Sequence, residues 1–170
     1  MPLLGKGVEY ALHCLTFLVH APGESVSVSD IAEFQGVSPT YLAKIFGRLK
    51  RSGIVTSSRG LRGGFALARS PEQITFWDVA VAVEGKPALF RCDDIRENCI
   101  LYQSADCKPE WLVGEMCAIH RTMMAAERQL EMFLRTQNLA WLAQTLSKKV
   151  PPLEVERGIE WFRNASSRRR

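Results

Sequence analysis

Apolar residues recur along most of this chain with the period of a helix. From Val8 to about His20 they fall every three or four positions and so share one helix face, and Pro22 ends the pattern. The opposite face carries Glu9 and His13, which are four residues apart and therefore one turn above one another. A pair with this spacing can present two ligands to a metal ion, although most such pairs are simply solvated.

Two further helices are predicted, with a tight turn between them. Ser27 and Asp30 have the capping-box spacing and open a short helix that ends at Gly36. Ser38 is then a second N-cap, with Pro39 at the first helical position, where its missing amide hydrogen costs nothing. The second helix has an apolar face and a basic face. This pattern is typical of a helix-turn-helix whose second helix reads DNA.

Two short strands, Ile54–Thr56 and Phe65–Leu67, are predicted next, with arginine and glycine between them. They form a hairpin with a flexible, cationic tip. A helix-turn-helix followed by such a hairpin is a winged helix, in which the helix fits the major groove and the wing meets phosphate or the minor groove. The candidate DNA-binding residues are Ser38, Pro39, Thr40, Tyr41, Lys44, Arg48, Arg51, Arg59 and Arg62.

The second half of the chain also predicts helices. Thr75 and Asp78 form another capping-box pair and open a helix. After Cys117, apolar residues keep helical register as far as Phe133, along a stripe rich in Met and Ala that is long for a chain of this size. We expect this helix to pair with a copy of itself rather than to pack back on its own domain. Asn138 then caps a short helix.

These elements predict a mainly α fold with a small β-wing, in which a winged helix-turn-helix domain is joined to a long dimerisation helix. We expect a C-terminal tail with a small amphipathic piece around Ile159, Trp161 and Phe162. We expect its final arginines to be disordered and to add weak affinity for phosphate. The expected segments are a DNA-binding domain at residues 1–85, a cysteine-rich cofactor-binding loop at 86–117, the dimerisation helix and a short following helix at 118–150, and a basic C-terminal tail at 151–170.

Charge is distributed unevenly along the 170 residues. The net charge is only +4, yet no Asp or Glu lies between Glu33 and Glu72, in a stretch that holds seven Lys and Arg residues. A basic block of this kind indicates a module that binds a polyanion, and it argues against a winged helix used for protein docking. No apolar run approaches the ~20 residues that span a membrane, and no signal-peptide pattern opens the chain. We therefore expect a cytoplasmic protein with no membrane partner.

Four of the five cysteines follow in an acid-rich stretch, with the spacing C-x6-C-x7-C-x9-C and then x2-His. This spacing is not the paired CxxC of a zinc ribbon. Clustered cytoplasmic cysteines are more often metal ligands or redox switches than structural disulfides, and thiolates suit iron-sulfur clusters. Residues 91–108 lack helix or strand periodicity, as expected of a loop shaped by a cofactor. The candidate ligands here are Cys92, Cys99, Cys107, Cys117 and His120.

A set of short motifs extends from roughly Gly7 to Leu146. They include Tyr10-Ala11-Leu12, Ile31-Ala32-Glu33, Val37-Ser38-Pro39-Thr40-Tyr41-Leu42, Gly53-Ile54-Val55, Gly63-Gly64-Phe65, Leu67-Ala68-Arg69, Ile74-Thr75 and Val83-Glu84-Gly85. Together they resemble the Rrf-type family of bacterial winged-helix regulators, which includes an iron-sulfur cluster regulator and a nitric-oxide-sensing repressor. The resemblance implies a homodimer that binds a pseudo-palindromic double-stranded DNA operator, with the long helix as the dimer seam.

The resemblance also implies a cluster held by loop cysteines and completed by a ligand that is not a cysteine. The ending Cys117-x2-His120 is similar to that of the iron-sulfur cluster regulator. It implies a set from one chain, consisting of Cys92, either Cys107 or Cys99, Cys117 and His120.

A second ligand set comes from the first helix. The run from Val8 to Cys14 resembles a 2Fe-2S redox-sensing subgroup, in which Glu9 and His13 of one chain would join Cys92 and Cys117 of the other. We favour this set and a 2Fe-2S cluster, with a 4Fe-4S cluster as the alternative. Sensing members usually have three cysteines about six residues apart, whereas this chain has four at wider spacing. Cys99 and Cys107 would then be spare or redox-active thiols, and Cys14 a buried small hydrophobe.

The function that we expect is sequence-specific repression of transcription, with an operator affinity switched by the redox or assembly state of the cluster. The alternative is a cluster-free regulator switched by thiol-disulfide chemistry. An enzyme with a cysteine nucleophile beside His120 is disfavoured, because no oxyanion-forming glycine motif or acid partner stands near Cys117. We therefore expect neither a catalytic activity nor a small-molecule substrate.

Overall fold

The structure is a computed structural model in which the chain divides into two compact units. The core unit contains Met1–Pro87 and Leu134–Arg170, and the cysteine unit contains Ala88–Phe133. Two candidate site residues, Arg62 and Cys107, lie outside the described residues. The residues described are 4–21, 24–60, 63–86, 88, 90–93, 95–103 and 109–168.

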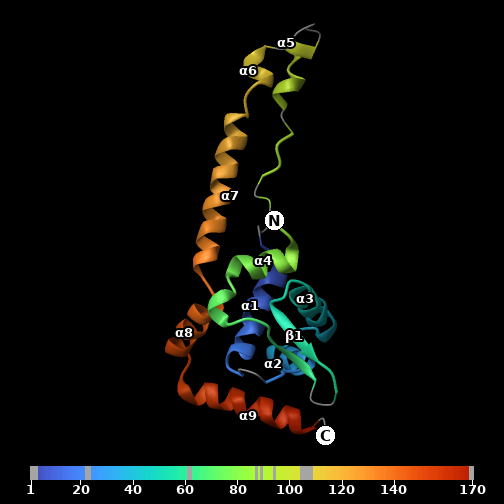
Figure 1. The fold of residues 1–170 in the computed structure, drawn as a ribbon, viewed down its shortest axis with the longest axis vertical. Helices are drawn as coiled ribbons and strands as arrows, with labels where there is room; N and C mark the ends of the chain where they lie inside the picture. Colours follow the sequence, from blue (N-terminus) through green and yellow to red (C-terminus); the bar gives the residue numbers. More distant parts are fainter. Residues whose placement is uncertain are drawn as a thin grey trace. The chain divides into compact units, whose positions relative to one another are not determined.

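The core unit begins with three helices (Figure 1), namely α1 (Lys6–Val19), α2 (Val28–Gln35) and α3 (Pro39–Arg51). Gly36 ends α2 with a φ of 64°, in the left-handed region that glycine adopts without steric cost. The Ser38 hydroxyl then accepts a hydrogen bond from the Tyr41 amide, and Pro39 opens α3. The predicted helix-turn-helix is confirmed.

The capping box predicted at the start of α2 is not formed. Ser27 is the N-cap residue, but its hydroxyl lies 2.8 Å from the hydroxyl of Ser29 and accepts no hydrogen bond from the backbone of the helix. A neighbouring hydroxyl has therefore taken the place of the backbone donor. Thr75, in contrast, accepts from the Asp78 amide while Asp78 accepts from the Thr75 amide, so the second predicted capping box is confirmed.

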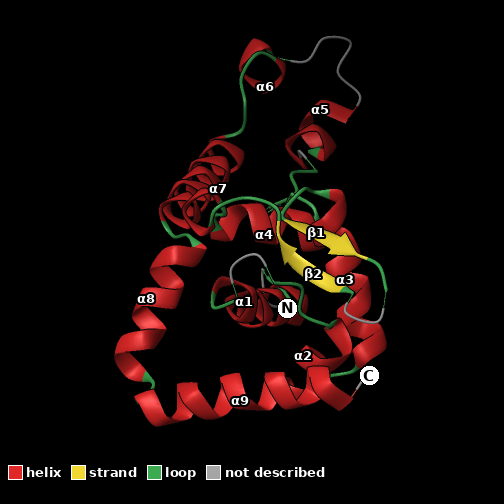
Figure 2. Cartoon of the chain, turned by 60° about the horizontal axis from the view of Figure 1, so that its bottom comes forward, coloured by secondary structure: helices red, strands yellow, loops and turns green. Residues whose placement is uncertain are grey.

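The wing is an antiparallel pair of strands (Figure 2), β1 (Val55–Ser58) and β2 (Gly64–Leu67). Val55 pairs with Leu67 at one end, and Phe65 also forms an isolated bridge with Val26 from the α1–α2 connection. A Cβ atom on Gly64 would lie 2.4 Å from the Val26 carbonyl oxygen. Only glycine therefore lets the connection approach the wing this closely.

Three further helical segments complete this part of the core unit, namely η1 (Pro71–Gln73), α4 (Phe76–Glu84) and α8 (Leu139–Lys149). The chain leaves the core unit after α4 and returns just before α8, and the two passages are joined by backbone hydrogen bonds. The Phe76 amide donates to the Gln137 carbonyl at 2.9 Å, and the Leu139 amide donates to the Ile74 carbonyl at 3.0 Å. Asn138 caps α8 through the Trp141 amide, as predicted.

One hydrophobic core joins these helices to the wing. Leu15 of α1, Leu42 and Phe46 of α3, Val79 of α4 and Leu139 of α8 are all 0% exposed. The Phe46 ring also packs edge-on against Phe65 of β2, with the ring centroids 5.1 Å apart. The mainly helical fold with a small antiparallel wing is therefore confirmed, and its core is the support for α3.

The C-terminal segment differs from the predicted tail. Residues Pro152–Arg168 form a helix, α9, within the core unit (Figure 2). Its Trp161 and Phe162 rings pack on Phe34 of α2, with ring centroids 5.1 and 5.0 Å from it, and Phe162 also meets Phe17 of α1. Local sequence favours a basic tail, but these long-range aromatic contacts stabilise a helix. The last two residues, 169 and 170, lie outside the described range.

The cysteine unit contains the short segments η2 (Ile95–Asn98), α5 (Ile100–Gln103) and α6 (Glu110–Val113), followed by most of the long helix α7 (Ala118–Thr136). The long helix begins directly after Cys117, as predicted. Leu112 is the only fully buried side chain among the described residues of this unit, and α7 has none along its length. In the part of the chain that the structure describes, no helix is long and apolar enough to cross a membrane.

Candidate functional site

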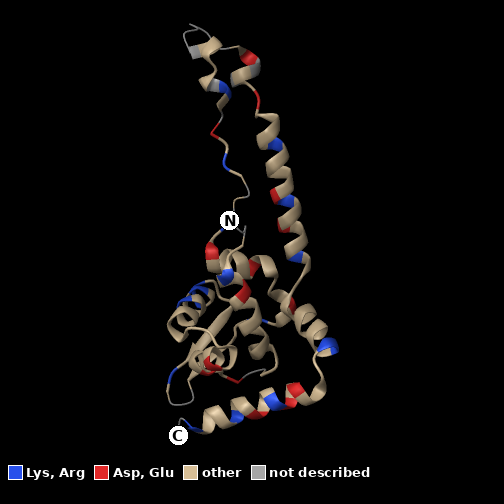
Figure 3. Ribbon diagram, turned by 180° about the vertical axis from the view of Figure 1, so that it is seen from behind, with Lys and Arg blue, Asp and Glu red and all other residues tan. Residues whose placement is uncertain are grey.

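The outward face of α3 carries the predicted DNA-binding residues. The apolar side of the helix, from Leu42 to Leu49, is buried in the core, so the opposite side faces solvent. Lys and Arg positions gather on α3 and on the hairpin in Figure 3. The predicted DNA-binding residues on and just before this helix are all exposed, namely Ser38, Pro39, Thr40, Tyr41, Lys44, Arg48 and Arg51.

Two basic side chains at the end of α3 also make contacts that sequence reasoning missed. The Arg48 guanidinium donates a hydrogen bond to the carbonyl of Val83, in the last turn of α4. The Lys50 ammonium donates to the Ser57 hydroxyl of β1 at 2.6 Å. These contacts fix α3 to α4 and to the wing. Arg48 thus has a structural contact in addition to its predicted one with DNA.

The wing presents Arg59 to solvent, immediately after β1. The strand that precedes it is tied to the α1–α2 connection, because the Ser58 hydroxyl donates to the Ser25 hydroxyl at 2.7 Å. Gly60 follows with a φ of 106°. Arg59 is therefore held at the end of an ordered strand, on a turn that glycine permits.

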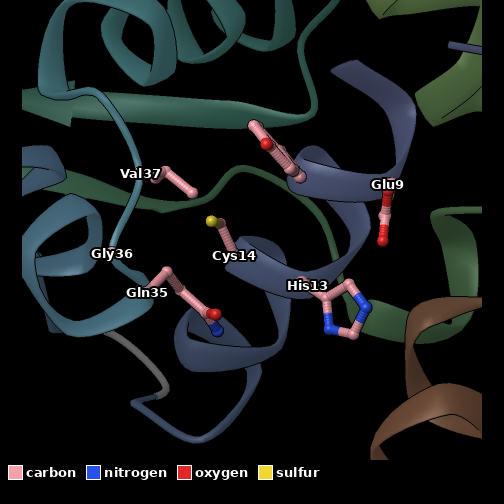
Figure 4. Close-up of a pocket in the computed structure, with 7 residues that line it drawn as sticks. Glu9, His13, Cys14, Gln35, Gly36 and Val37 are labelled. Carbon is pink, nitrogen blue, oxygen red and sulfur yellow. The ribbon is translucent and has the colours of Figure 1, made fainter. Parts of the chain in front are cut away.

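A pocket of about 290 Å³ lies between α1 and the turn that joins α2 to α3 (Figure 4). Glu9 and His13 line it from α1, and both side chains are exposed. In Figure 4 they project from one side of α1, whereas Cys14 points toward Val37. Neither the Glu9 carboxylate nor the His13 imidazole makes a hydrogen bond or ion pair with a described residue. Their donor atoms are therefore available to an incoming group.

Cys14 also lines this pocket but belongs to the core. Its side chain is 1% exposed, and burial raises the pKa of the thiol from 9.0 to about 12. A thiol with so high a pKa stays protonated at neutral pH and is a poor nucleophile and metal ligand. The prediction that Cys14 is a buried small hydrophobe is confirmed.

The remaining described cysteines, Cys92, Cys99 and Cys117, are half-buried thiols in the cysteine unit. Two contacts bring the two ends of this stretch together. The Phe90 and His120 rings pack with centroids 6.3 Å apart, and the Arg96 guanidinium donates to the Glu115 carbonyl at 3.2 Å. Across the described ranges, however, no three His, Cys, Asp or Glu side chains gather closely enough to hold a metal ion.

The donor types fit an iron-sulfur cluster better than they fit a hard cation. Cysteine thiolates are soft ligands that select iron-sulfur chemistry, and an imidazole or carboxylate can replace a thiolate on one iron. Of the predicted ligands, Cys92 and Cys117 offer sulfur, while Glu9 and His13 offer an oxygen and a nitrogen one helical turn apart. The single-chain set, which relies on His120, is not assembled among its described members.

Several known proteins are similar to this chain in sequence. IscR of Yersinia enterocolitica is 30% identical over 142 residues, which cover 84% of this chain and 79% of the relative. IscR of Photorhabdus laumondii is 35% identical over 99 residues, or 58% of this chain and 60% of the relative. Both are named as helix-turn-helix-type transcriptional regulators.

Solved structures share the fold. T. potens IscR superposes with a TM-score of 0.64 at 22% identity, over 87% of this chain and 90% of that one. CymR, the global cysteine regulator of B. subtilis, superposes with a TM-score of 0.62 at 22% identity, over 85% of this chain and 98% of that one.

The helix-turn-helix, the wing and the basic outer face of α3 define a winged-helix transcriptional regulator that binds DNA. The chain belongs to the Rrf2 family, whose model is described as an iron-dependent transcriptional regulator and matches residues 4–145. These relatives and neighbours are transcriptional regulators, so the prediction that the chain is not an enzyme is confirmed.

Proposed function

We propose that the protein is a homodimeric repressor whose affinity for its operator is set by the state of a 2Fe-2S cluster. Cys92 and Cys117 of one chain hold the cluster together with Glu9 and His13 of the partner subunit. When bound, the cluster supplies a one-electron redox centre. The observation that carries the proposal is the pair on α1, because Glu9 and His13 are exposed, one turn apart and without a described partner.

The long helix supports the homodimer. Its apolar positions Ile119, Met123, Ala126, Leu130 and Phe133 alternate spacings of four and three, which is the repeat of a helix that pairs with another helix. No residue of α7 is buried in a single chain, and the Ile119 side chain is 65% exposed. A second copy of α7 would remove this apolar surface from water.

Helix α1, which carries Glu9 and His13, also contacts α3, the proposed DNA-recognition helix. Tyr10 follows Glu9 in α1 and packs edge-on against Tyr41 of α3, with ring centroids 5.9 Å apart. A Cβ atom on Gly7 would lie 3.2 Å from the Tyr41 hydroxyl oxygen. A change in the bonds made by Glu9 and His13 would therefore act on a helix that is packed against Tyr41.

A second candidate function is a DNA-binding regulator without a cluster, in which thiol-disulfide chemistry changes the affinity for DNA. It is favoured by the half-buried thiols of Cys92, Cys99 and Cys117, which lie in one unit. Oxidation to a disulfide would then be the signal. DNA binding by metal-free protein that is lost with diamide and restored with a dithiol would support this function over the cluster.

The direct test of the cluster is anaerobic purification, followed by an absorbance spectrum and by iron and acid-labile sulfide assays. We expect a coloured protein with one 2Fe-2S cluster per chain, because each homodimer contains two sites of the proposed kind. A colourless protein without iron, after anaerobic reconstitution, would rule the cluster out.

Variants distinguish the set that contains Glu9 and His13 from the single-chain set that contains His120. Glu9→Gln combined with His13→Ala should abolish the 2Fe-2S spectrum, while His120→Ala should leave it intact. His20→Ala is the matched control, since His20 is another exposed histidine at the end of α1. Loss of the cluster in His120→Ala alone would favour the single-chain set and a cluster confined to one subunit.

A further inference from the structure

Helix α9 lies beyond the part of the chain that matches the family, which ends at residue 145. It is nevertheless anchored to the helix-turn-helix. Ala165 is 3% exposed, and the Trp161 and Phe162 rings pack against Phe34 of α2. Gly158 lies against the same ring, since a Cβ atom there would be 3.7 Å from Phe34 Cζ. The helix therefore has a fixed position on the DNA-binding domain.

The charges of α9 are divided along its length. Its acidic residues, Glu154, Glu156 and Glu160, all lie in the first part of the helix, and none follows. Arg163 and Arg168 lie in the second part, and both are exposed. A helix dipole favours cations in the last turn, but Arg163 is more than one turn from the end. The dipole alone therefore does not account for the basic half.

The basic half of α9 lies beside α2, the first helix of the helix-turn-helix. The Arg168 guanidinium is 3.9 Å from the Glu33 carboxylate of α2 and stacks over the Trp161 ring at 5.7 Å. The end of α9 lies beside α2 in Figure 2, and in Figure 3 the basic positions of α3, of the described part of the hairpin and of the end of α9 lie along one side of the core unit. The side that carries the predicted DNA contacts thus continues onto α9.

Glu33 is the acid that borders the acid-free basic block. Both partners of its ion pair with Arg168 are well exposed, with 60% of the Arg168 side chain and 61% of the Glu33 side chain accessible. Exposed ion pairs of this kind add little stability and exchange readily. The pair has a clearer electrostatic effect, because it neutralises a carboxylate that would otherwise repel a phosphate beside α2.

We infer that the basic half of α9 is a second DNA-binding surface, in which Arg163 and Arg168 contact backbone phosphates of the operator outside the segment read by α3 and the wing. This inference rests on the DNA-binding function of the family. The contacts carry no base specificity, because phosphate is the same at every position. They extend the footprint and add to the salt dependence of binding.

The test uses the full chain and duplexes that the wild-type protein selects from a random library. Each selected sequence is made with flanks of 2 and of 12 base pairs. Affinity is then measured against salt concentration for the wild type and for the Arg163→Gln, Arg168→Gln double variant. On the long duplex we expect the double variant to bind about tenfold more weakly, with a salt slope smaller by about 0.9 for each phosphate contact removed.

Two controls make the result specific. Arg157→Gln removes a cation from the acidic half of α9, where it pairs with Glu154 at 2.8 Å, and should leave the affinity and the slope unchanged. On the short duplex, the double variant should lose much less affinity than on the long one, because there only the unpaired Glu33 carboxylate acts. Far-UV circular dichroism verifies that the helix remains, and glutamine is chosen because it is a good helix former.

Equal salt slopes for the double variant and the wild type on the long duplex would overturn the inference. So would an equal loss of affinity on both duplexes, because the contact would then lie inside the segment read by α3. If the wild-type protein selects no duplex at all, the DNA-binding function itself fails, and this outcome is distinct from the other two. Arg168→Glu gives a further measurement, with a larger expected loss on the long duplex.

Discussion

The core unit and the cysteine unit differ in how much apolar surface one chain can bury. In the core unit, side chains such as Leu42, Phe46 and Leu139 are fully buried among helices that are far apart in the sequence. In the described part of the cysteine unit, only Leu112 is buried, while Ile95 and Ile100 remain 76% and 79% exposed. Burial of apolar area is the main stabilising term of a fold. The core unit therefore has the apolar burial that stabilises a fold, whereas the described part of the cysteine unit has little of it within one chain.

The largest expected effect tests the core unit. Phe46→Ala removes a side chain that is 0% exposed and packed against Phe65. A cavity of this size should lower the free energy of unfolding by about 3–5 kcal/mol and remove DNA binding with it. Urea denaturation followed by circular dichroism measures the change. A loss below about 1 kcal/mol would show that the core does not support α3 as described.

The second expected effect concerns reactivity. Cys14 should react with iodoacetamide roughly a thousandfold more slowly in native protein at pH 8 than in urea, because the thiolate is the reactive form and burial raises the pKa of this thiol from 9.0 to about 12. Peptide mapping by mass spectrometry measures the rate. Cys92 and Cys99, which are half-buried, serve as internal controls. Rapid labelling of Cys14 in native protein would contradict its place in the core.

The thiol of Cys14 should also make the free energy of unfolding depend on pH. The folded-state pKa of Cys14 is raised from 9.0 to about 12, so the neutral thiol favours folding below about pH 9. That contribution is lost as the pH rises from about 9 to about 12, because the unfolded chain releases the proton first. Urea denaturation of the wild type and of Cys14→Ala over this range should give curves of different slope. Parallel curves would argue against the raised pKa.

A smaller effect on the free energy of unfolding should distinguish the N-cap of α4 from the N-cap of α2. Thr75→Ala removes a complete capping box and should lower the free energy of unfolding by about 1 kcal/mol. Ser27→Ala is the matched control, since the Ser27 hydroxyl bonds Ser29 and caps no backbone amide. It should change stability by less than half as much. An equal loss in both variants would mean that the hydroxyl of Ser27 also caps α2.

The smallest expected effect on folding lies in the cysteine unit. Ile119→Ala alters an exposed side chain of α7 and should change the free energy of unfolding of a single chain by less than about 0.5 kcal/mol. It should nevertheless weaken self-association, because this side chain is part of the proposed dimer seam. Sedimentation equilibrium measures the association constant. A variant that associates as tightly as the wild type would place the seam elsewhere.

Local signals account for the parts of the fold that sequence predicted well. Ser38, Pro39 and Thr75 act on their own helix turns, and the structure shows them in the roles expected. For α9 the sequence predicts only a small amphipathic piece around Trp161 and Phe162, whereas the helix extends over Pro152–Arg168. The contacts that Phe162 makes with Phe17 and Phe34, residues more than a hundred positions away, cannot be predicted from local periodicity.

The candidate site likewise has features that local sequence predicts and features that depend on long-range packing. The one-turn spacing of Glu9 and His13 follows from helix periodicity alone, and so does the burial of Cys14 on another side of α1. The other wall of their pocket, formed by Gln35 and Val37, depends on how α1 packs on the helix-turn-helix. Sequence reasoning therefore predicts the pair Glu9 and His13 as candidate ligands, but it does not predict the pocket that they line.

The order of the chain has a consequence for synthesis on the ribosome. Leu139 is fully buried in the core unit, yet the whole cysteine unit, residues 88–133, is translated before it. At about 5–20 residues per second, this unit takes roughly 2–9 s to emerge. By the end of that interval the thiols of Cys92, Cys99 and Cys117 have emerged, while the core still lacks α8. Nascent chains therefore expose their cysteines before the DNA-binding domain can close.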